Sequence, residues 1–360
     1  MEKYLVALNR IEKLTPLRFR KLLSYFAEDI ERLWNSTASE WKEAGIESNT
    51  VEEIWRIKNE INPEVELKKL QDFGGGVIGI TDAKYPRLLR EIYDAPPVLL
   101  FRGEFPVAAD DFAVAVVGTR VATPYGKQAT AEIARGLSQA GIPIVSGLAA
   151  GLDSVAHQAA VEMGRRSIAV FGCGLDTIYP PTNRKLAEEI IAKGGCWLSE
   201  YPLGTQPTAY TFPQRNRIIA GLSRGVLVAE GREKSGSLIT AQLANEFGRE
   251  VFAIPGSIFS EVSAGPNRLI QAGAKPILSA ADILEALNYG DLGQKVEMRE
   301  VIADSPEEAK ILSILTKNPL LADEVSRQSG FTASEASAIL SLLEMKGLAK
   351  NLGGMQWVRS

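Results

Sequence analysis

The stretch Ala113–Arg120, AVAVVGTR, decides the fold of this chain, because five apolar residues run directly into glycine, threonine and arginine. A short apolar run that ends at glycine is typical of a buried central strand entering a tight turn. The residues from Pro124 to Ala140 then have the pattern of a helix. A strand–turn–helix unit gathers backbone N–H groups at the end of the strand, where anions bind. The turn Gly118-Thr119-Arg120 therefore predicts a phosphate site; the alternative is that Arg120 caps a neighbouring element on the surface.

The same alternation of strand and helix continues through residues 113–287. Strands are expected at residues 113–117, 142–146, 166–171, 196–200, 226–229 and 251–254. Helices are expected at about residues 127–140, 154–163, 184–192, 215–221, 237–247 and 267–273. Nearly continuous apolar strands separated by helices indicate a parallel sheet that is covered on both faces. The predicted fold class is α/β, with an extended Rossmann-like, doubly wound parallel sheet.

The flanking segments predict two smaller helical parts. Residues 1–70 have helical spacing and predict an N-terminal helical bundle with Trp34, Trp41 and Trp55 in its core. Residues 71–112 contain two short strand patterns, which we expect to extend the sheet edge, so the Rossmann-like domain is placed at 71–287. Residues 288–304 have few apolar residues and predict a linker. Residues 305–360 predict three helices and a hairpin, which is the pattern of a winged-helix-like domain. Thr332 and Glu335 form a capping box that marks the start of its third helix.

Composition narrows the class of protein. The net charge of −4 over 360 residues excludes a generally basic nucleic-acid binder but allows a local basic groove. Cys173 and Cys196 match no metal or redox spacing, which indicates a reduced cytosolic protein. No signal sequence or apolar run of about 18 residues is present, so we expect a soluble, cytoplasmic protein without a membrane partner.

Several enzyme chemistries are disfavoured by spacing. Gly147 and Gly151 do not form the dinucleotide fingerprint G-x-G-x-x-G, and no acidic residue follows at the expected place. Asp153, Ser154 and the single histidine, His157, are interpreted as helix-start and helix-face residues rather than a hydrolase triad. The carboxylates at the strand ends lack the paired spacing of a Mg²⁺ site. We therefore expect no catalytic residue, no metal site and no cofactor.

The predicted strands each end in a small or polar turn, and these turns should meet at one edge of the sheet. Glycines there let a ligand approach the backbone, and several arginines on one edge can follow a run of phosphates. Aromatic residues at the same edge can stack bases, with core packing as the alternative. The aromatic candidates are Tyr179, Tyr201, Tyr210 and Phe212. The polar and basic candidates are Arg120, Arg184, Lys185, Arg215, Asn216, Arg217, Arg232, Lys234, Ser235, Gly236 and Ser237.

Six motifs carry a family resemblance: VAVVGTR (114–120), SGLAAGLDSVAHQAA (146–160), FGCGLDTIYP (171–180), FPQRNRIIAGLS (212–223), SGSLITAQLA (235–244) and VFAIPGS (251–257). In these motifs and their order the sequence resembles the DprA/Smf family, the DNA-processing proteins of bacterial transformation. The resemblance covers residues 75–360, and the N-terminal bundle would correspond to a SAM or helix–hairpin–helix domain. It implies a homodimer that binds and protects single-stranded DNA and helps to load RecA, without an essential catalytic step.

The resemblance also assigns residues. It implies phosphate contacts at Gly118, Thr119 and Arg120 and a groove lined by Ser146, Gly147, Gly151 and the loop at Asn183. Family members often carry lysine directly after the Tyr-Pro pair, where this sequence has Pro181. Arg184 or Lys185, on the following helix, is expected to supply that charge instead. The implied dimer contacts are at Leu269, Ile270 and Pro276.

Two questions stay open. The turn from Gly231 to Ser237 is loosely similar to the phosphate loops of nucleoside-phosphate phosphoribohydrolases, and Arg217 and Glu230 would then be the catalytic pair of a nucleoside-phosphate-processing enzyme. In the C-terminal domain, the presumed recognition helix carries Glu335, Glu344 and a single lysine, Lys346. Because glutamates repel phosphates, we favour a protein-contact role over duplex binding there.

Overall fold

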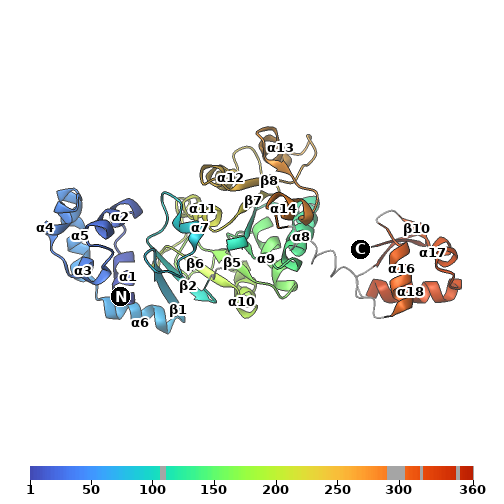
Figure 1. Ribbon diagram of the computed structural model, residues 1–360, viewed down its shortest axis with the longest axis horizontal. Coiled ribbons are helices and arrows are strands. Elements are labelled where there is room, and N and C mark those ends of the chain that lie inside the picture. The colour runs from blue at the N-terminus through green and yellow to red at the C-terminus, as the bar shows by residue number, and fades with distance from the viewer. Residues whose placement is uncertain (106–110, 290–304, 317–318, 346–348, 360) are drawn as a thin grey trace. The chain divides into compact units, whose positions relative to one another are not determined.

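The computed structural model describes residues 1–105, 111–289, 305–316, 319–345 and 349–359. It contains two compact units, residues 1–292 and 293–360 (Figure 1). Most of the predicted linker, residues 290–304, lies outside the described residues, as does Lys346. None of the helices in the described ranges is long and apolar enough to cross a membrane.

The first unit is organised around a sheet, in which the described residues form nine strands in the order β1-β2-β6-β5-β4-β3-β7-β8-β9. The strands are β1 (Gly75–Gly79), β2 (Val98–Gly103), β3 (Val114–Val117), β4 (Ile144–Ser146), β5 (Ser167–Val170), β6 (Cys196–Ser199), β7 (Gly225–Val228), β8 (Glu250–Ala253) and β9 (Lys275–Pro276). Strands β3 to β9 are mutually parallel, whereas β1 and β2 add to the β6 edge in antiparallel pairing. This arrangement confirms the predicted doubly wound sheet and its extension at one edge.

Strand β3 lies at the centre of the seven parallel strands, in agreement with the central position that its apolar sequence predicts. All four of its residues are buried. The next strand in the chain, β4, pairs on one side of it, and the much later β7 pairs on the other. The order of the chain therefore reverses at β3, and such a reversal opens a crevice at the carboxyl ends of the strands.

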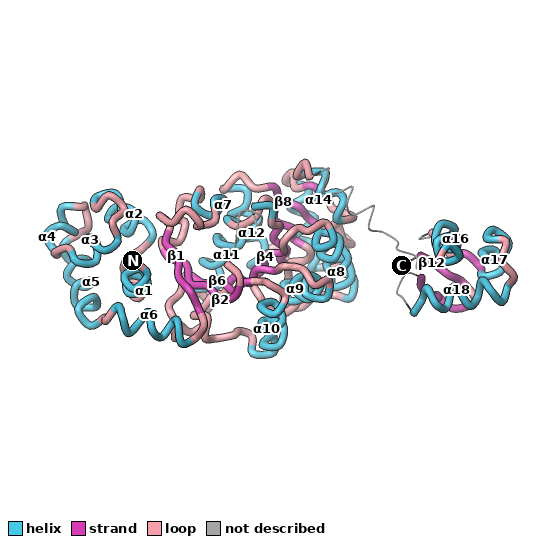
Figure 2. The backbone as a smooth tube through the Cα atoms, turned by 60° about the horizontal axis from the view of Figure 1, so that its bottom comes forward, coloured by secondary structure: helices cyan, strands magenta, loops and turns pink. Residues whose placement is uncertain are grey.

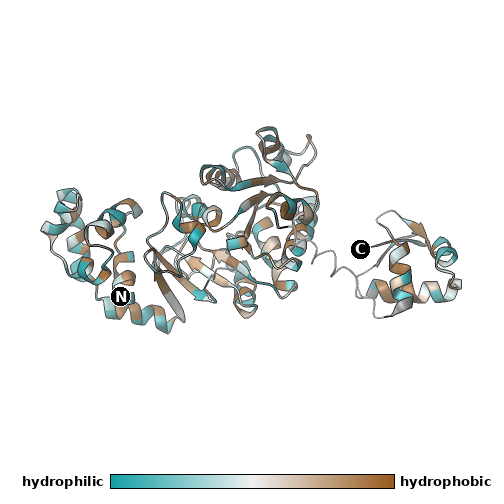
Figure 3. Ribbon diagram, viewed as in Figure 1, coloured by the Kyte–Doolittle hydropathy of each residue, from teal (hydrophilic) through white to brown (hydrophobic). Residues whose placement is uncertain are grey.

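Helices cover both faces of this sheet (Figures 1 and 2). Helices α8 (Pro124–Gln139), α9 (Leu152–Glu162), α10 (Arg184–Ala192) and α14 (Ala280–Ala286) pack on one face. Helices α7 (Arg87–Arg90), α11 (Thr211–Gly221) and α12 (Gly236–Glu246) pack on the other. Short 3-10 helices lie at η2 (Pro181–Asn183) and η3 (Glu261–Ser263), and α13 (Ala264–Gln271) precedes β9. Figure 3 shows the hydrophobic residues concentrated on the strands and on one side of the helices.

Local signals explain most of the helix boundaries. Thr123 caps α8 by accepting a hydrogen bond from the backbone of Gly126 at 3.0 Å, and Pro124 occupies the first helical position. Helix α11 begins at Thr211, four residues earlier than the predicted start at Arg215. The early start is possible because Pro213 lies in the first turn, where its missing N–H costs no helical hydrogen bond.

The N-terminal helices are α1 (Glu2–Asn9), α2 (Pro16–Tyr25), α3 (Ile30–Asn35), α4 (Ala38–Glu43), α5 (Ser48–Glu60) and α6 (Pro63–Asp72). Trp41 is fully buried and its ring lies 5.2 Å from that of Trp55, in agreement with the predicted tryptophan core. The same hydrophobic cluster continues through Leu100 and Trp197 of the sheet. The residues on either side of the predicted boundary at position 70 thus share one core and belong to one compact unit.

The second unit has a winged-helix arrangement. Its elements are α16 (Pro306–Ile314), β10 (Leu320–Leu321), α17 (Ala322–Ser329), α18 (Ala333–Met345), β11 (Ala349–Gly353) and β12 (Gln356–Arg359). In the described part the strands pair in the order β10-β12-β11. The predicted capping box is present, because Thr332 accepts from the backbone of Glu335 at 3.3 Å and the Glu335 carboxylate accepts from the backbone of Thr332 at 2.9 Å.

Candidate functional site

A pocket of about 610 Å³ lies at the carboxyl ends of β3 and β7, next to the point where the strand order reverses. Open α/β sheets bind their ligands at this position. Predicted site residues among its lining are Gly118, Thr119, Arg120, Arg215, Asn216, Ser235, Gly236 and Ser237. Residues from three separate stretches of the sequence thus meet in one hollow. Predicted aromatic candidates Tyr179 and Phe212 also line it.

The turn after β3 is held tightly by its neighbours. The Thr119 backbone N–H donates to the Glu230 carbonyl at 2.8 Å. Gly151 has a φ of +86°, and a Cβ added there would lie 2.3 Å from the Thr119 carbonyl oxygen. Only glycine fits this left-handed, crowded position without strain. Gly151 therefore packs directly against the backbone of this turn, and it is not among the residues that line the pocket.

Arg120 supplies an accessible positive charge. Its side chain is exposed, and its guanidinium carbon lies 5.3 Å from the centre of the Phe212 ring. Phe212 in turn packs against Tyr179, with ring centres 5.4 Å apart. Within the described ranges of the chain, Arg120 forms no ion pair. A guanidinium oriented over an aromatic face and free of carboxylates is well suited to bind phosphate.

The N-terminus of α12 faces the same pocket. Ser235 caps this helix by accepting from the Ser237 backbone at 3.4 Å, and the two hydroxyl groups lie 2.8 Å apart. Asn216 reaches across from α11, and its Nδ2 donates to the Gly236 carbonyl at 3.2 Å. The positive end of the helix dipole and these hydroxyl groups add hydrogen-bond donors beside Arg120.

Arg215 lines the pocket from the inside, with only 4% of its surface exposed. It donates to the Gly147 carbonyl at 2.8 Å and to the Val170 carbonyl. Burial lowers the pKa of Arg215, and the nearby buried carboxylate of Asp153 opposes that shift. A Cβ on Gly147 would lie 2.5 Å from the Arg215 guanidinium, so Gly147 makes room for this charge. These hydrogen bonds hold the pocket wall together, and the predicted DNA contact at Arg215 stays a prediction.

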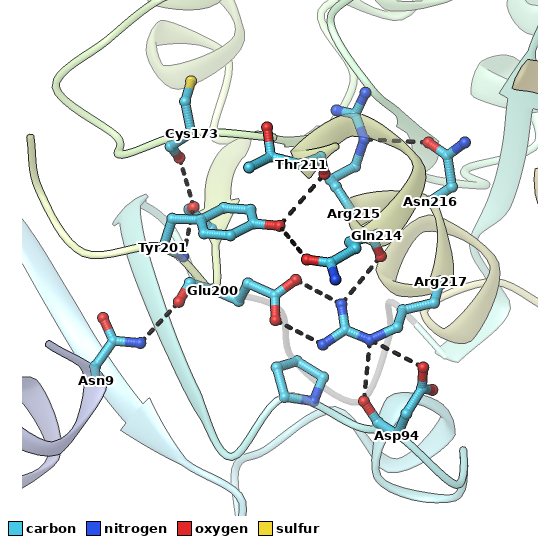
Figure 4. Close-up of polar contacts among 12 residues, drawn as sticks. Asn9, Asp94, Cys173, Glu200, Tyr201, Thr211, Gln214, Arg215, Asn216 and Arg217 are labelled. Atoms are coloured by element: carbon cyan, nitrogen blue, oxygen red, sulfur yellow. Dashed lines mark hydrogen bonds and ion pairs between the residues drawn. The ribbon is translucent and has the colours of Figure 1, made fainter. Parts of the chain in front are cut away.

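Arg217, two residues further along α11, does not line the pocket, and its guanidinium points toward Glu200 and Asp94 (Figure 4). Its guanidinium forms a bidentate ion pair with Glu200, at 2.5 and 2.6 Å, and a further pair with Asp94 at 3.2 Å. The Glu230 carboxylate is also engaged, because it accepts hydrogen bonds from the backbone and hydroxyl of Thr123. Neither Arg217 nor Glu230 lines the pocket and both are already paired, so this geometry does not support the predicted phosphate contact at Arg217 or the alternative catalytic pair.

Asn183 and Lys185 lie in a separate hollow of about 480 Å³ against α8, α9 and α10. The Asn183 amide donates to the Leu148 carbonyl and to the Ser154 hydroxyl, both at 2.8 Å. The Lys185 side chain is 91% exposed and lies 3.6 Å from Glu189. Arg184 is exposed beside it. Arg184 and Lys185, the predicted replacements for the missing lysine, are therefore exposed to solvent but do not line the pocket of about 610 Å³.

The predicted groove residue Ser146 and the single histidine, His157, are both internal. Ser146 is fully buried, and its hydroxyl donates to the Val116 carbonyl at 2.6 Å, so it does not reach the groove. His157 is buried with its Nδ1 2.7 Å from the Ser167 hydroxyl, and burial lowers the pKa of His157 to about 3. Ser154 donates instead to the Ala149 carbonyl, which agrees with the rejection of a hydrolase triad.

Sequence reasoning missed one wall of the pocket. This wall consists of Pro207, Thr208 and Ala209, from the long connection between β6 and α11. No charge or motif in those residues signals a site, since they contribute only to the shape of the pocket.

The predicted dimer residues are accessible: Leu269 and Ile270 are half-buried on α13, and Pro276 is exposed on β9.

Comparison with known proteins places this arrangement in a family. The family model for DNA recombination-mediator protein A matches residues 76–288, and that for the DprA winged helix domain matches residues 298–355. The Smf protein of Synechocystis is 36% identical over 99% of this chain and 98% of its own.

Two solved structures share the fold. The X-ray structure of DprA from Streptococcus pneumoniae superposes with a TM-score of 0.70 at 39% identity, over 79% of this chain and 98% of that one. DprA from Helicobacter pylori, whose structure is described as revealing a unique mode of binding single-stranded DNA, has a TM-score of 0.54 at 32% identity, over 60% of this chain and 96% of that one. On this match of family, sequence and fold, the chain belongs to the DprA family of DNA recombination-mediator proteins.

Proposed function

We propose that this protein binds single-stranded DNA at the carboxyl edge of its sheet and acts, without catalysis, as a recombination mediator. In this proposal it works in the cytoplasm as a homodimer, protects DNA that enters during natural transformation, and helps to load RecA onto it. Membership of the DprA family and the single-strand binding described for the Helicobacter pylori relative support the proposal.

The observation that carries the proposal is the exposed guanidinium of Arg120. It lines a pocket that also contains a helix N-terminus and serine hydroxyl groups. Arg215 and Arg217 are committed to internal carbonyls and carboxylates, so Arg120 bears most of the charge that a phosphate would meet. Pro181 in place of the family's lysine increases that share further.

The aromatic residues of the pocket favour a single strand over a duplex. Tyr179 is 42% exposed and packs against Phe212 with the two rings tilted by 37°. A base that is free of pairing can stack on such a ring with about 1–3 kcal/mol, whatever its identity. In a duplex the bases are stacked inside the helix and cannot reach the ring. We therefore expect binding that depends weakly on sequence.

The direct test measures binding of a fluorescent oligothymidine across a salt series. Replacing Arg120 with Ala should raise the dissociation constant by about 10-fold or more, since hydrogen bonds to charged groups contribute about 1.5–3 kcal/mol. It should also reduce the slope of log K against log salt by about 0.7, the value expected for one lost phosphate contact on a single strand. Arg56→Ala, on an exposed arginine of α5, is the matched control.

If the Arg120→Ala variant bound DNA as tightly as the unaltered protein, the DNA site would have to lie elsewhere on the chain. Equal affinity for single-stranded and double-stranded DNA would contradict the stacking argument. The RecA step is tested separately, by whether the protein accelerates RecA assembly on DNA already covered by single-strand-binding protein. Incubation with purine monophosphates, followed by a search for released base, tests the enzymatic alternative, which no contact in the pocket favours.

A further inference from the structure

The N-terminal helices hold the start of the segment that forms one wall of the pocket. This segment, which we call the β6–α11 connection, comprises residues 200–210. The Asn9 Nδ2 at the end of α1 donates to the Glu200 carbonyl at 2.7 Å, and Arg10 donates to the Leu203 carbonyl at 3.0 Å. The Leu203 side chain also packs against the hydrophobic cluster that contains the N-terminal helices.

The far end of the same connection reaches the pocket. Pro207, Thr208 and Ala209 line it, and Phe212 follows directly in the first turn of α11. Between the two ends, the Gly204 N–H donates to both carboxylate oxygens of Asp176 at 2.9 Å. The hydrogen bonds from Asn9 and Arg10 to residues 200–203 therefore help to fix the position of the pocket wall.

A second set of contacts connects the N-terminal helices to α11. Glu200 holds Arg217 through its carboxylate while its own carbonyl is held by Asn9 (Figure 4). Arg20 of α2 donates to the carbonyls of Ile92 and Tyr93, at 2.9 and 2.7 Å. Those residues directly precede Asp94, the other acid that pairs with Arg217. The N-terminal helices thus hold the backbone beside both acids that fix α11.

We infer that the N-terminal helices are a positioning element for the DNA pocket and that Asn9 and Arg10 are its positioning residues. Neither residue lines the pocket. Their effect is transmitted through the backbone of the β6–α11 connection and through the fixed orientation of α11. A segment opens locally when its few anchors are lost, while the rest of the fold stays closed. The inference rests on the proposed DNA function only for its binding readout.

The test uses the full-length chain with Asn9→Ala and Arg10→Ala combined, and with Arg10→Ala alone in case the double variant folds poorly. In Arg10→Ala, hydrogen–deuterium exchange of residues 204–213 should become about threefold to tenfold faster, the range expected for one lost hydrogen bond, and the double variant, which loses two, should exchange faster still. The dissociation constant for oligothymidine should rise by a similar factor. Arg10→Lys, which keeps a donor for the Leu203 carbonyl, should restore most of both readouts.

Lys69→Ala is the matched control. Lys69 lies 2.6 Å from Glu66, which Arg10 also approaches at 3.5 Å, so this variant removes a cation from the same carboxylate without touching the connection. Unchanged exchange and unchanged binding in the Asn9 and Arg10 variants would overturn the inference, as would equal effects of Lys69→Ala. If the unaltered protein fails to bind DNA, the proposed function fails, whereas the exchange measurement still decides the positioning role.

Discussion

The ion pair between Glu200 and Arg217 offers a quantitative test of how the site is held together. Burial lowers the pKa of Arg217, but Glu200 and Asp94 outweigh that effect and leave the pKa raised. Glu200→Ala would remove two charged hydrogen bonds, of 2.5 and 2.6 Å, and leave a guanidinium of which only 9% is exposed with Asp94 as its remaining acid. Removing one partner of a buried pair costs about 3–5 kcal/mol. We expect the lower end of that range, because Asp94 compensates part of the charge.

Urea unfolding followed by tryptophan fluorescence measures this loss. A decrease of about 3 kcal/mol corresponds to a fall in Tm of about 6 °C for a unit of this size. The double variant Glu200→Gln with Arg217→Met should be more stable than Glu200→Ala, because it leaves no uncompensated buried cation. A cost below about 1 kcal/mol for Glu200→Ala, or a double variant that is less stable than the single one, would refute this account of the ion pair.

Three further outcomes follow from particular residues. Burial lowers the pKa of His157 to about 3 from 6.5, so only the unfolded state binds a proton between these values, and stability falls as pH drops below 6.5. This loss should reach about 3 kcal/mol at pH 4.5 in urea unfolding and be missing from His157→Gln; an identical acid response in both proteins would contradict it. Gly151→Ala should weaken DNA binding about 10-fold or more, because its Cβ would meet the Thr119 carbonyl at 2.3 Å, whereas Gly164→Ala, with open space around it, should bind normally. Ile270→Glu should convert the proposed dimer to a monomer in sedimentation experiments, and an unchanged oligomer would place the interface away from α13.

The fold was largely predictable, because burial on both faces leaves a simple pattern in the sequence. Strand β3 could be recognised from the apolar run before Gly118, since a central parallel strand contacts helices on both sides. Helix starts were predictable where a capping side chain signals them, as Thr332 does. The packing across the predicted domain boundary at position 70 was less predictable, because the sequence does not show which neighbour an apolar residue will pack against. Leu70 is fully buried in a cluster that also contains residues of the sheet.

The roles of the arginines could not be predicted in the same way. Arg215, Asn216 and Arg217 are consecutive, yet they face an internal wall, the α12 terminus and a buried acid pair, respectively. Helical geometry separates their directions by about 100° per residue. Which direction leads to solvent depends on partners that lie far away in the sequence, such as Asp94. A charged residue in a motif therefore shows that the position is important without showing whether its charge is available.

The core that the N-terminal helices share with the sheet limits how this protein can evolve. A module can be gained or lost between relatives when its removal leaves a polar surface behind. Here, deletion of the first seventy residues would remove α1 and α6, which pack on β1, and would expose an apolar patch around Val77 and Leu100, which share one hydrophobic cluster with Leu5 and Leu70. Such a patch favours aggregation. A lineage could therefore discard these helices only after substituting the outer face of the sheet, and the two parts are bound to change together.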